Sequence, residues 1–389
     1  MTTAQVRVGE ISEQVRGVTY GKGDASDTAQ DGYLPILRAG NITETGAVFD
    51  DLVYVPAGHV APKQILRSGD VLIAASSGSL DVVGKAAPIL SDYEGAFGAF
   101  CKVLRPNQAR VNPSYFAHFF KTAEYRRIVS GLAAGANINN LRNEHLDDLL
   151  IPLPPLPEQQ RIAAILDKAD ALRTKRREAL TQLGRLATSI FLEMFGDPAK
   201  NPKGWPVRAL KELGRVSTGG TPPSAKEGMF GGDIPFVTPG DLESGKPVRR
   251  TVTEAGAQEA GTIRAGASLV CCIGATIGKM DAALVRSSFN QQLNAVEWFE
   301  DCVDDSYGLA SLKFFKPTIV AWGASTTLPI LKKSSFEKIS IPTPPVAMQR
   351  EFARCAREVS RIEEKLRSAL ERDTELFSSL QSKAFQGSL

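Results

Sequence analysis

Two stretches of the chain repeat one pattern of apolar and polar positions, 190 residues apart. Within residues 156–198 the apolar or near-apolar positions alternate three and four residues apart, and within 346–389 the same spacing returns without an insertion. This spacing is typical of helices that pair along an apolar stripe, as in a coiled coil. The stripe is formed in the first stretch by Ile162, Ile165, Ala169, Leu172, Arg176, Ala179, Leu183, Leu186 and Ile190, and in the second by Phe352, Cys355, Val359, Ile362, Leu366, Ala369, Asp373, Leu376 and Leu380.

The stripe holds one charged residue in each copy. Arg176 stands where the second copy has Leu366, and Asp373 stands where the first copy has Leu183. If the two helices run antiparallel, these charges fall in the same or adjacent layers, so we expect an ion pair that helps to fix the register. Two alternatives are that Arg176 extends into solvent, and that each helix packs only against its own domain.

A proline-rich connector precedes each of these stretches. Residues 151–160 read "IPLPPLPEQQ" and residues 341–350 read "IPTPPVAMQR", with three prolines and one glutamine at matching places. Proline restricts the backbone, so each connector is expected to fix the angle between a domain and its helix. The second copy has Ala347 and Met348 in place of a Pro-Glu pair that favours a helix start, which leaves its first helical residue open.

The remaining segments also resemble each other. "YLPILRAGNI" (33–42) is echoed by "DIPFVTPGDL" (233–242), and "LRSGDVLIAASSGSLDVVGK" (66–85) by "IRAGASLVCCIGATIGK" (263–279). Short β-branched runs separated by Gly, Pro, Asn and Asp turns predict irregular β-rich domains, with a helix over 113–132 that Asn112 caps. We therefore predict an α+β fold with two globular domains, 1–155 and 199–345, joined by two helical segments, 156–198 and 346–389, that form an antiparallel coiled coil.

Composition places the chain among ordinary globular proteins. It has 389 residues, 43% hydrophobic and 23% charged, with a net charge of +3. Five cysteines, an odd number, favour reduced thiols in the cytoplasm, and no stretch predicts a signal peptide or a membrane helix. None of the three histidines lies near a cysteine in a zinc-like spacing, so we expect no metal site.

The sequence offers little for catalysis. "NPSYF" (112–116) is similar to the N-P-P-[FY] motif of amino-group DNA methyltransferases, but Ser114 replaces a proline and no suitable glycine-rich loop accompanies it. We find no phosphate-binding loop, nucleophile motif or carboxylate cluster of a nuclease. A non-catalytic chain without a cofactor is the expectation.

Polar loops that recur in both halves are the candidates for binding. Glycine and hydroxyl groups in "VSTGGTPPS" (216–224) could meet phosphates, and the amides of "FNQQLN" (289–294) could read adenine edges. Taken singly, each of these is more often an ordinary turn or surface strand, and only their recurrence in both halves favours DNA contact. The candidate DNA contacts are Arg38, Asn41, Ser77, Ser79 and Lys85 in the first half, and Gly219, Gly220, Thr221, Ser224, Thr276, Lys279, Gln291 and Gln292 in the second.

Taken together, these features resemble the specificity subunit of type I restriction-modification enzymes over essentially the full chain. The likeness is carried by "PLPPLPEQQRIAAILDKADAL" (152–172), "GGTPPSAKEGMFGGDIPFVTPGDL" (219–242), "GATIGK" (274–279) and the order of the segments. It implies two target-recognition domains that each read one half of a bipartite, asymmetric site in double-stranded DNA. It also implies that the helices set the spacing and dock two methyltransferase subunits, which restriction subunits then join.

Two other classes of function remain as alternatives. One is an enzyme with fused recognition domains, which would need a cofactor motif and more chain than is present. The other is a coiled-coil scaffold that does not contact DNA. Salt-dependent retention on DNA in the presence of the methyltransferase separates the scaffold from a DNA reader.

Overall fold

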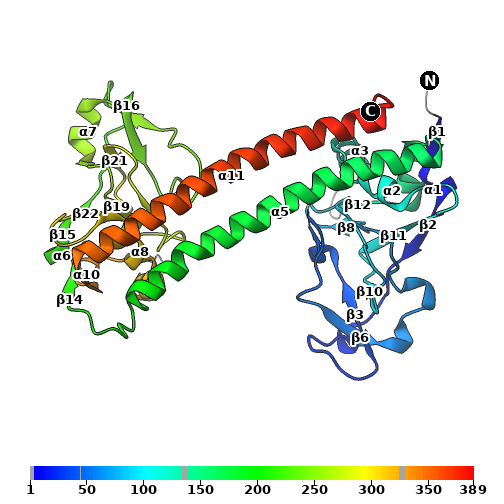
Figure 1. Cartoon of the computed structure of the whole chain (residues 1–389), viewed down its shortest axis with the longest axis horizontal. Coiled ribbons are helices and arrows are strands. Elements are labelled where there is room, and N and C mark those ends of the chain that lie inside the picture. The colour runs from blue at the N-terminus through cyan, green and yellow to red at the C-terminus, as the bar shows by residue number, and fades with distance from the viewer. Residues whose placement is uncertain (1–3, 44, 134–138, 324–328) are drawn as a thin grey trace. The chain divides into compact units, whose positions relative to one another are not determined.

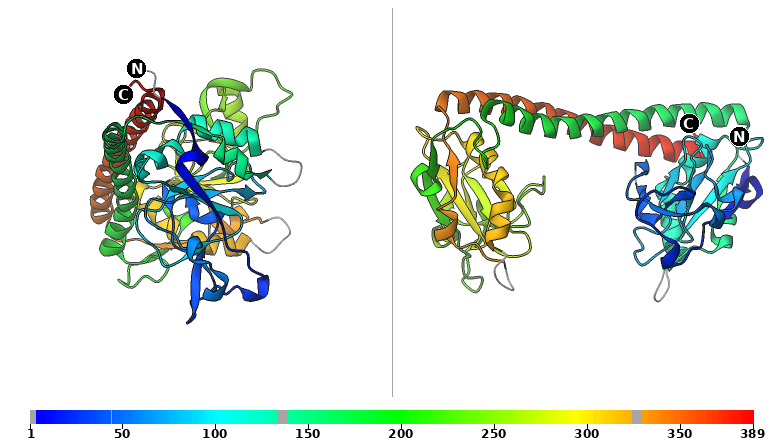
Figure 2. Two further views of the ribbon diagram at one scale, coloured as in Figure 1. Left: turned by 90° about the vertical axis from the view of Figure 1, so that its right-hand side faces the viewer. Right: turned by 90° about the horizontal axis from the view of Figure 1, so that it is seen from below.

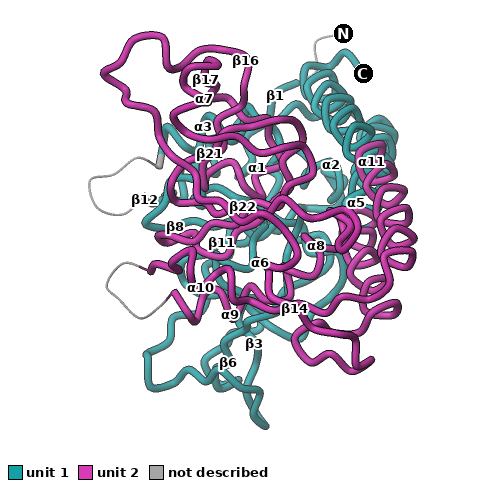
Figure 3. Tube along the Cα trace, turned by 90° about the vertical axis from the view of Figure 1, so that its left-hand side faces the viewer, with its two compact units in different colours: residues 1–178, 367–389 teal, residues 179–366 magenta. Residues whose placement is uncertain are grey.

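The chain packs as two compact units. The computed structural model describes residues 4–43, 45–133, 139–323 and 329–389. Unit 1 consists of residues 1–178 and 367–389, and unit 2 of residues 179–366 (Figure 3). Each unit therefore contains one domain and one half of each long helix. The four-segment division predicted from the sequence describes the order along the chain, whereas packing assigns each helix to both units.

Both long helices form where the apolar pattern predicts them. They are α5 (Leu156–Phe195) and α11 (Val346–Gln386) (Figure 1). Val346 lies 190 positions after Leu156, so the second helix starts at the equivalent residue although it lacks the Pro-Glu pair. The shared prolines of the connector, at 344 and 345, disfavour a helical backbone at the residue before each of them, in agreement with this start.

The two helices run antiparallel in unit 1. Arg161 Nη2 donates to the Leu389 carbonyl (2.8 Å), and the Arg173 guanidinium lies 4.3 Å from the centre of the Phe377 ring. Residue numbers rise along α5 as they fall along α11, which defines the antiparallel direction. Within each unit the helices cover one side of that unit's domain (Figure 2).

The domain of unit 1 is built on two small sheets. One is a four-stranded antiparallel sheet in the order β2-β11-β7-β9, and the other has the order β10-β3-β6 with a parallel β10–β3 pair. Shorter strand pairs are β1–β13, β4–β5 and β8–β12. The strands are β1 (Gln5–Arg7), β2 (Ser12–Arg16), β3 (Tyr33–Leu37), β4 (Ile42–Thr43), β5 (Gly46–Ala47), β6 (Val53–Pro56), β7 (Val71–Ala74), β8 (Ser76–Ser77), β9 (Ala86–Pro88), β10 (Ala96–Phe97), β11 (Cys101–Pro106), β12 (Asn139–Asn140) and β13 (Leu150–Pro152).

The domain of unit 2 repeats this plan. Its sheets have the orders β15-β22-β19-β20 and β17-β16-β21-β18, and β14 pairs with β23 as β1 pairs with β13. The strands are β14 (Val207–Ala209), β15 (Gly214–Thr218), β16 (Phe230–Val237), β17 (Thr251–Val252), β18 (Thr262–Ile263), β19 (Ser268–Cys271), β20 (Met280–Ala282), β21 (Ser287–Phe289), β22 (Leu293–Trp298) and β23 (Ser340–Pro342). The predicted α+β class with two repeated domains is confirmed.

Short helices cover the sheets and contact the long helices. The helix expected over 113–132 is divided into two, because the Thr122 hydroxyl bonds to the Phe119 carbonyl and accepts from the Tyr125 N–H. Asn112 caps the first of them as predicted, accepting from the Tyr115 N–H (3.0 Å). The short helices are α1 (Val8–Ile11), α2 (Pro113–Phe119), α3 (Ala123–Ala133), α4 (Asn143–Asp147), α6 (Leu210–Leu213), α7 (Glu254–Ala260), α8 (Asp305–Phe314), α9 (Lys316–Gly323) and α10 (Lys333–Phe336).

The buried stripe of the long helices is rotated relative to the predicted one. Leu172, Leu186, Ile362 and Leu376 were expected in the seam, but 46%, 43%, 42% and 56% of each residue is exposed. In places the residue one position further along is buried instead, such as Leu166 beside half-buried Ile165 and Phe377 beside Leu376, whereas Ile162, Phe352 and Val359 of the predicted stripe are buried as expected.

The rotation has a physical cause, because each helix has two neighbours to cover. Ile162, Leu166 and Phe377 share one apolar cluster with Tyr115 and Phe116 of α2, so the stripe must face both the partner helix and the domain. The equivalent cluster in unit 2 joins Phe191 and Phe352 to residues of α8. A stripe that serves two neighbours is wider than a coiled-coil seam and is centred elsewhere. The alternative that the helices pack only on their own domains is therefore wrong.

The predicted ion pair within the stripe is present. Arg176 Nε lies 2.5 Å from Asp373 Oδ2, and the two side chains are 28% and 17% exposed. Their equivalents in unit 2, Leu366 and Leu183, are both half-buried apolar residues. One layer of the helix pair is thus ionic in unit 1 and apolar in unit 2, which makes the two repeats chemically different.

A buried glutamine ties each long helix to its domain. Gln159, 1% exposed, accepts from the Asn112 N–H (2.8 Å) and donates to the Pro154 carbonyl (2.8 Å). Gln349, fully buried, accepts from the Asp304 N–H (2.9 Å) and donates to the Pro344 carbonyl (2.7 Å).

Each glutamine thus bonds the N-cap residue of a domain helix and a proline of the connector. We call this contact between a domain, its connector and its long helix a joint. A buried tyrosine adds one hydrogen bond to each joint, because Tyr115 and Tyr307 donate to the carbonyls of Pro152 and Pro342. The repeated proline and glutamine positions of the sequence are therefore the parts of one joint, used twice.

We predict a measurable coupling between Arg176 and Asp373. In a cycle of Arg176→Ala, Asp373→Ala and the double variant, urea unfolding should give a coupling of about 0.5–1 kcal/mol, as expected for a partly exposed pair. Arg361→Ala with Glu358→Ala, an exposed pair on α11, serves as the control with weaker coupling. Effects that add within about 0.3 kcal/mol would show that Arg176 and Asp373 do not interact.

The joints predict a larger effect on stability. Gln159→Leu or Gln349→Leu keeps the side-chain size but leaves a buried N–H and a carbonyl without partners, so each should lower the free energy of unfolding by about 2–4 kcal/mol. Gln182→Leu, at an exposed position of α5, should change it by less than about 0.5 kcal/mol. A joint variant as stable as the Gln182 control would refute this role.

Candidate nucleic-acid interface

Three segments of unit 2 that the sequence singles out come together. Thr221 donates its hydroxyl hydrogen to Gln291 Oε1. Gln292 lies beside Gly274, where an added Cβ would be 3.6 Å from its side-chain nitrogen. The glycine-rich loop at 219–221, the turn that begins at Gly274 and the amides at 290–292 therefore form one polar surface.

The glycines of this surface do not present free N–H groups to a ligand. The Gly219 N–H donates to the Leu293 carbonyl (3.2 Å), and the Gly220 N–H donates to the carbonyls of Ala260 (3.0 Å) and Phe289 (3.1 Å). A Cβ on Gly219 would lie 2.2 Å from the Phe289 oxygen. The expectation that these N–H groups meet phosphates is wrong, because the glycines allow close packing of two backbones instead.

The other candidates of unit 2 lie around this surface. Thr276 is half-buried, with its hydroxyl 3.5 Å from the Cys271 sulfur, and Ser224 is exposed in the loop beyond Thr221. Lys279 is half-buried, and its positive charge helps to lower the pKa of the Glu243 carboxyl. Burial would raise the pKa of the Glu243 carboxyl, but the Met280 N–H, Lys316 and Lys279 together hold it below its ordinary value.

Two of the candidates in unit 1 are used within the domain. Asn41 is 5% exposed; its amide donates to the Asp50 carbonyl (2.8 Å) and accepts from the Arg38 N–H (2.8 Å). The Asn41 side chain therefore closes a turn, and its contact with DNA stays a prediction. Arg38 is exposed, but its guanidinium is 3.3 Å from an Asp51 carboxylate oxygen.

The remaining candidates of unit 1, Ser77, Ser79 and Lys85, are half-buried or exposed. Ser77 belongs to β8, which pairs with β12, and its hydroxyl accepts from the Ser79 N–H (3.2 Å). Lys85 is half-buried, and its carbonyl accepts from Ala74 as the Lys279 carbonyl accepts from Cys271 (2.9 and 2.8 Å). The predicted equivalence of Lys85 and Lys279 is confirmed.

Two three-residue segments occupy the same place in the two units. Residues 98–100 connect β10 to β11, and residues 290–292 connect β21 to β22; we call them the tip segments. Their order is Gly-Ala-Phe in unit 1 and Asn-Gln-Gln in unit 2. The reading of the sequence missed Phe100, which is 68% exposed. Aligning "GAFGAF" with "SSFNQQ" would have identified it.

A buried lysine lies in β11, directly after the tip segment of unit 1. Lys102 Nζ donates to the Leu141 carbonyl (2.8 Å) and to Asn143 Oδ1 (2.9 Å). Burial lowers the pKa of this ammonium group below its ordinary value, and nearby Arg16 acts in the same direction. Lys102 thus ties β11 to the segment that follows β12.

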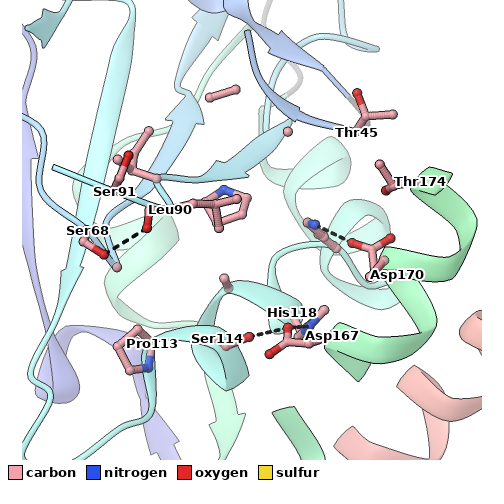
Figure 4. Close-up of a pocket in the computed structure, with 18 of the residues that line it drawn as sticks. Thr45, Ser68, Leu90, Ser91, Pro113, Ser114, His118, Asp167, Asp170 and Thr174 are labelled. Carbon is pink, nitrogen blue, oxygen red and sulfur yellow. Dashed lines mark hydrogen bonds and ion pairs between the residues drawn. The ribbon is translucent and has the colours of Figure 1, made fainter. Parts of the chain in front are cut away.

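A cavity of about 630 Å³ in unit 1 lies between the domain and α5. Asp167 Oδ1 accepts from Ser114 Oγ (2.6 Å) and lies 2.8 Å from His118 Nε2 (Figure 4). Burial would raise the pKa of Asp167, but the hydrogen bonds from His118 and Ser114 hold it below its ordinary value. Serine and histidine share one carboxylate oxygen, so the histidine does not activate the serine. Ser114, His118 and Asp167 thus connect α2 to α5 and form part of the contact between the domain and its long helix.

Within the residues that the structure describes, no three His, Cys, Asp or Glu side chains gather closely enough to hold a metal ion. No helix there has the length and the apolar composition needed to cross a bilayer.

Sequence comparisons identify relatives of the chain. It is 43% identical over 183 residues to the StySPI specificity subunit of Salmonella potsdam and 45% identical over 160 residues to the EcoKI specificity subunit of Escherichia coli K12. Both relatives are named as subunits of type I restriction enzymes. These matches cover 47% and 41% of this chain, but only 39% and 34% of the relatives. A match to the putative MjaX specificity subunit of Methanocaldococcus jannaschii is 24% identical and covers 82% of this chain and 79% of the relative.

Solved structures share the fold. The S subunit of a type I restriction-modification system from M. genitalium is 15% identical, with a TM-score of 0.63 and 99% coverage of both chains. A chain from a structure of type I restriction-modification complex assembly is 20% identical, with a TM-score of 0.56, and the match covers 100% of this chain and 98% of the other.

The family described as the type I restriction modification DNA specificity domain matches residues 2–182 and 202–372. Each match spans one β-rich domain and most of the long helix that follows it, in agreement with the structural repeat. The chain therefore belongs to the type I restriction modification DNA specificity family.

Proposed function

We propose that this chain is the non-catalytic DNA-reading subunit of a type I restriction-modification complex. Each domain reads one half of a bipartite, asymmetric site in double-stranded DNA. Methyltransferase and restriction subunits, acting in the cytoplasm, supply the chemistry. Family membership and relatives named as specificity subunits support this proposal.

The observation that carries the proposal is the difference between the two tip segments. Equivalent backbones present Gly-Ala-Phe in one unit and Asn-Gln-Gln in the other. Two copies of one scaffold with different exposed side chains suit a ligand whose two halves differ in sequence, because base edges are distinguished by hydrogen bonding and apolar contact.

We further propose that the long helices set the spacing of the half-sites and dock two methyltransferase subunits. A helix of 40 residues is about 60 Å long, and half-sites that face the same side of DNA are about 34 Å apart. Leu172 and Leu376 in unit 1, and Leu186 and Ile362 in unit 2, are exposed apolar residues on these helices. Apolar residues left uncovered in both units suit a partner that is present twice.

Exchanging one domain at a time tests the proposal. Replacing residues 1–150 with those of a relative of different specificity should change one half of the methylated motif, and replacing residues 207–340 should change the other half. The spacing should stay constant in both exchanges. Sequencing that maps methylated bases in cells carrying each chimera and the methyltransferase gives the result.

An assay of the purified chain provides a control. The purified chain without methyltransferase should leave DNA unmodified and uncut. A chimera in which both halves of the motif change, or in which the spacing changes, would contradict independent reading by the two domains.

A further inference from the structure

The two tip segments have the same backbone hydrogen bonds. In each, the first residue donates to the strand beside it, the residue after the tip donates back to the first, and the carbonyl of the third accepts from the residue that directly follows a neighbouring strand. The bonds in unit 1 are Gly98 to Leu37 (2.9 Å), Cys101 to Gly98 (2.8 Å) and Ala75 to Phe100 (2.9 Å), and those in unit 2 are Asn290 to Val237 (3.0 Å), Leu293 to Asn290 (3.1 Å) and Cys272 to Gln292 (2.9 Å). Residues 100 and 292 therefore hold equivalent positions.

The side chains of the two tip segments differ in polarity. The tip of unit 2 carries three amides, and two of them bond to each other, Asn290 Nδ2 to Gln292 Oε1 (3.1 Å). The tip of unit 1 has no side chain that can form a hydrogen bond. Its one large side chain, Phe100, is 68% exposed although the next residue, Cys101, is fully buried. The phenyl ring is thus held out from a backbone that its hydrogen bonds fix.

We infer that Phe100 makes the apolar contact to a thymine methyl group by which unit 1 reads one position of its half-site. This inference rests on the proposed function. The thymine methyl is the apolar feature of the major groove, whereas amides such as Gln292 suit adenine edges. Because residues 100 and 292 are equivalent, Phe100 contacts a base edge at the place where Gln292 does so in unit 2. The two half-sites are then read by different chemistry on one scaffold.

A double-mutant cycle, which combines a substitution in the protein with a base change in the DNA, tests this contact. The complex of the chain with its methyltransferase subunits binds a duplex carrying the mapped site, and each thymine of the first half-site is replaced in turn by uracil, which lacks only the methyl group. At one position, uracil should weaken binding by the wild type about three- to tenfold. The Phe100→Ala complex should bind the thymine duplex that much more weakly and lose nothing more with uracil.

A matched variant in unit 2 provides the control. Gln292→Ala should weaken binding while leaving the uracil effect in the first half-site unchanged. Phe100→Leu, which keeps an apolar side chain, should retain most of the affinity. Since Phe100 is largely exposed, the thermal unfolding of the Phe100→Ala chain should match that of the wild type.

Three results would overturn the inference. They are independent, additive losses from Phe100→Ala and uracil, a first half-site without thymine, and loss of the methyltransferase subunits from the Phe100→Ala complex. Each leaves the proposed function intact, provided that the wild-type complex binds a bipartite site. If the wild-type complex binds no such site, the proposed function itself fails.

Discussion

A buried glutamine at the start of each long helix is the contact on which the arrangement of each unit depends. It satisfies the N–H of a helix cap in the domain and a carbonyl of the proline connector at the same time. A buried amide has no water to replace a lost partner, so the helix cannot turn relative to the domain without leaving polar groups unpaired. The restricted prolines beside it remove most of the remaining freedom. Each domain is thereby fixed to its helix.

The long helices each pack against two neighbours, the partner helix and a domain, and both contacts constrain their sequence. Their buried stripe faces both the partner helix and α2 or α8, so some residues at coiled-coil spacing, such as Leu172 and Leu376, are left uncovered. The layer that holds Arg176 and Asp373 in unit 1 is apolar in unit 2. A duplicated framework thus carries differences in both its helices and its tips, as the proposed reading of an asymmetric site would require.

The sequence predicted what depends on local rules and on repetition. Helix spacing gave α5 and α11, the capping preference of asparagine gave the start of α2, and antiparallel geometry gave the Arg176–Asp373 pair. It did not predict which side of each helix is buried, because that depends on a third element, the domain. It also did not reveal that the side chain of Asn41 and the N–H groups of Gly219 and Gly220 have partners within the protein, which come from residues distant in the sequence or from the turn itself. Phe100 was not predicted, because a single exposed aromatic residue produces no periodic pattern in the sequence.

If rigid joints and paired helices fix the spacing of the half-sites, lengthening both helices should lengthen the unread spacer and change nothing else. One heptad inserted after Glu178 and one after Leu366 lie at the borders between the units and keep Arg176 beside Asp373. Seven residues add about 10 Å of helix, or roughly three base pairs of DNA. Mapping methylated bases in cells that carry this variant and the methyltransferase should show the same two half-sites separated by about three more base pairs. An unchanged spacer in a complex that still methylates DNA would contradict the account.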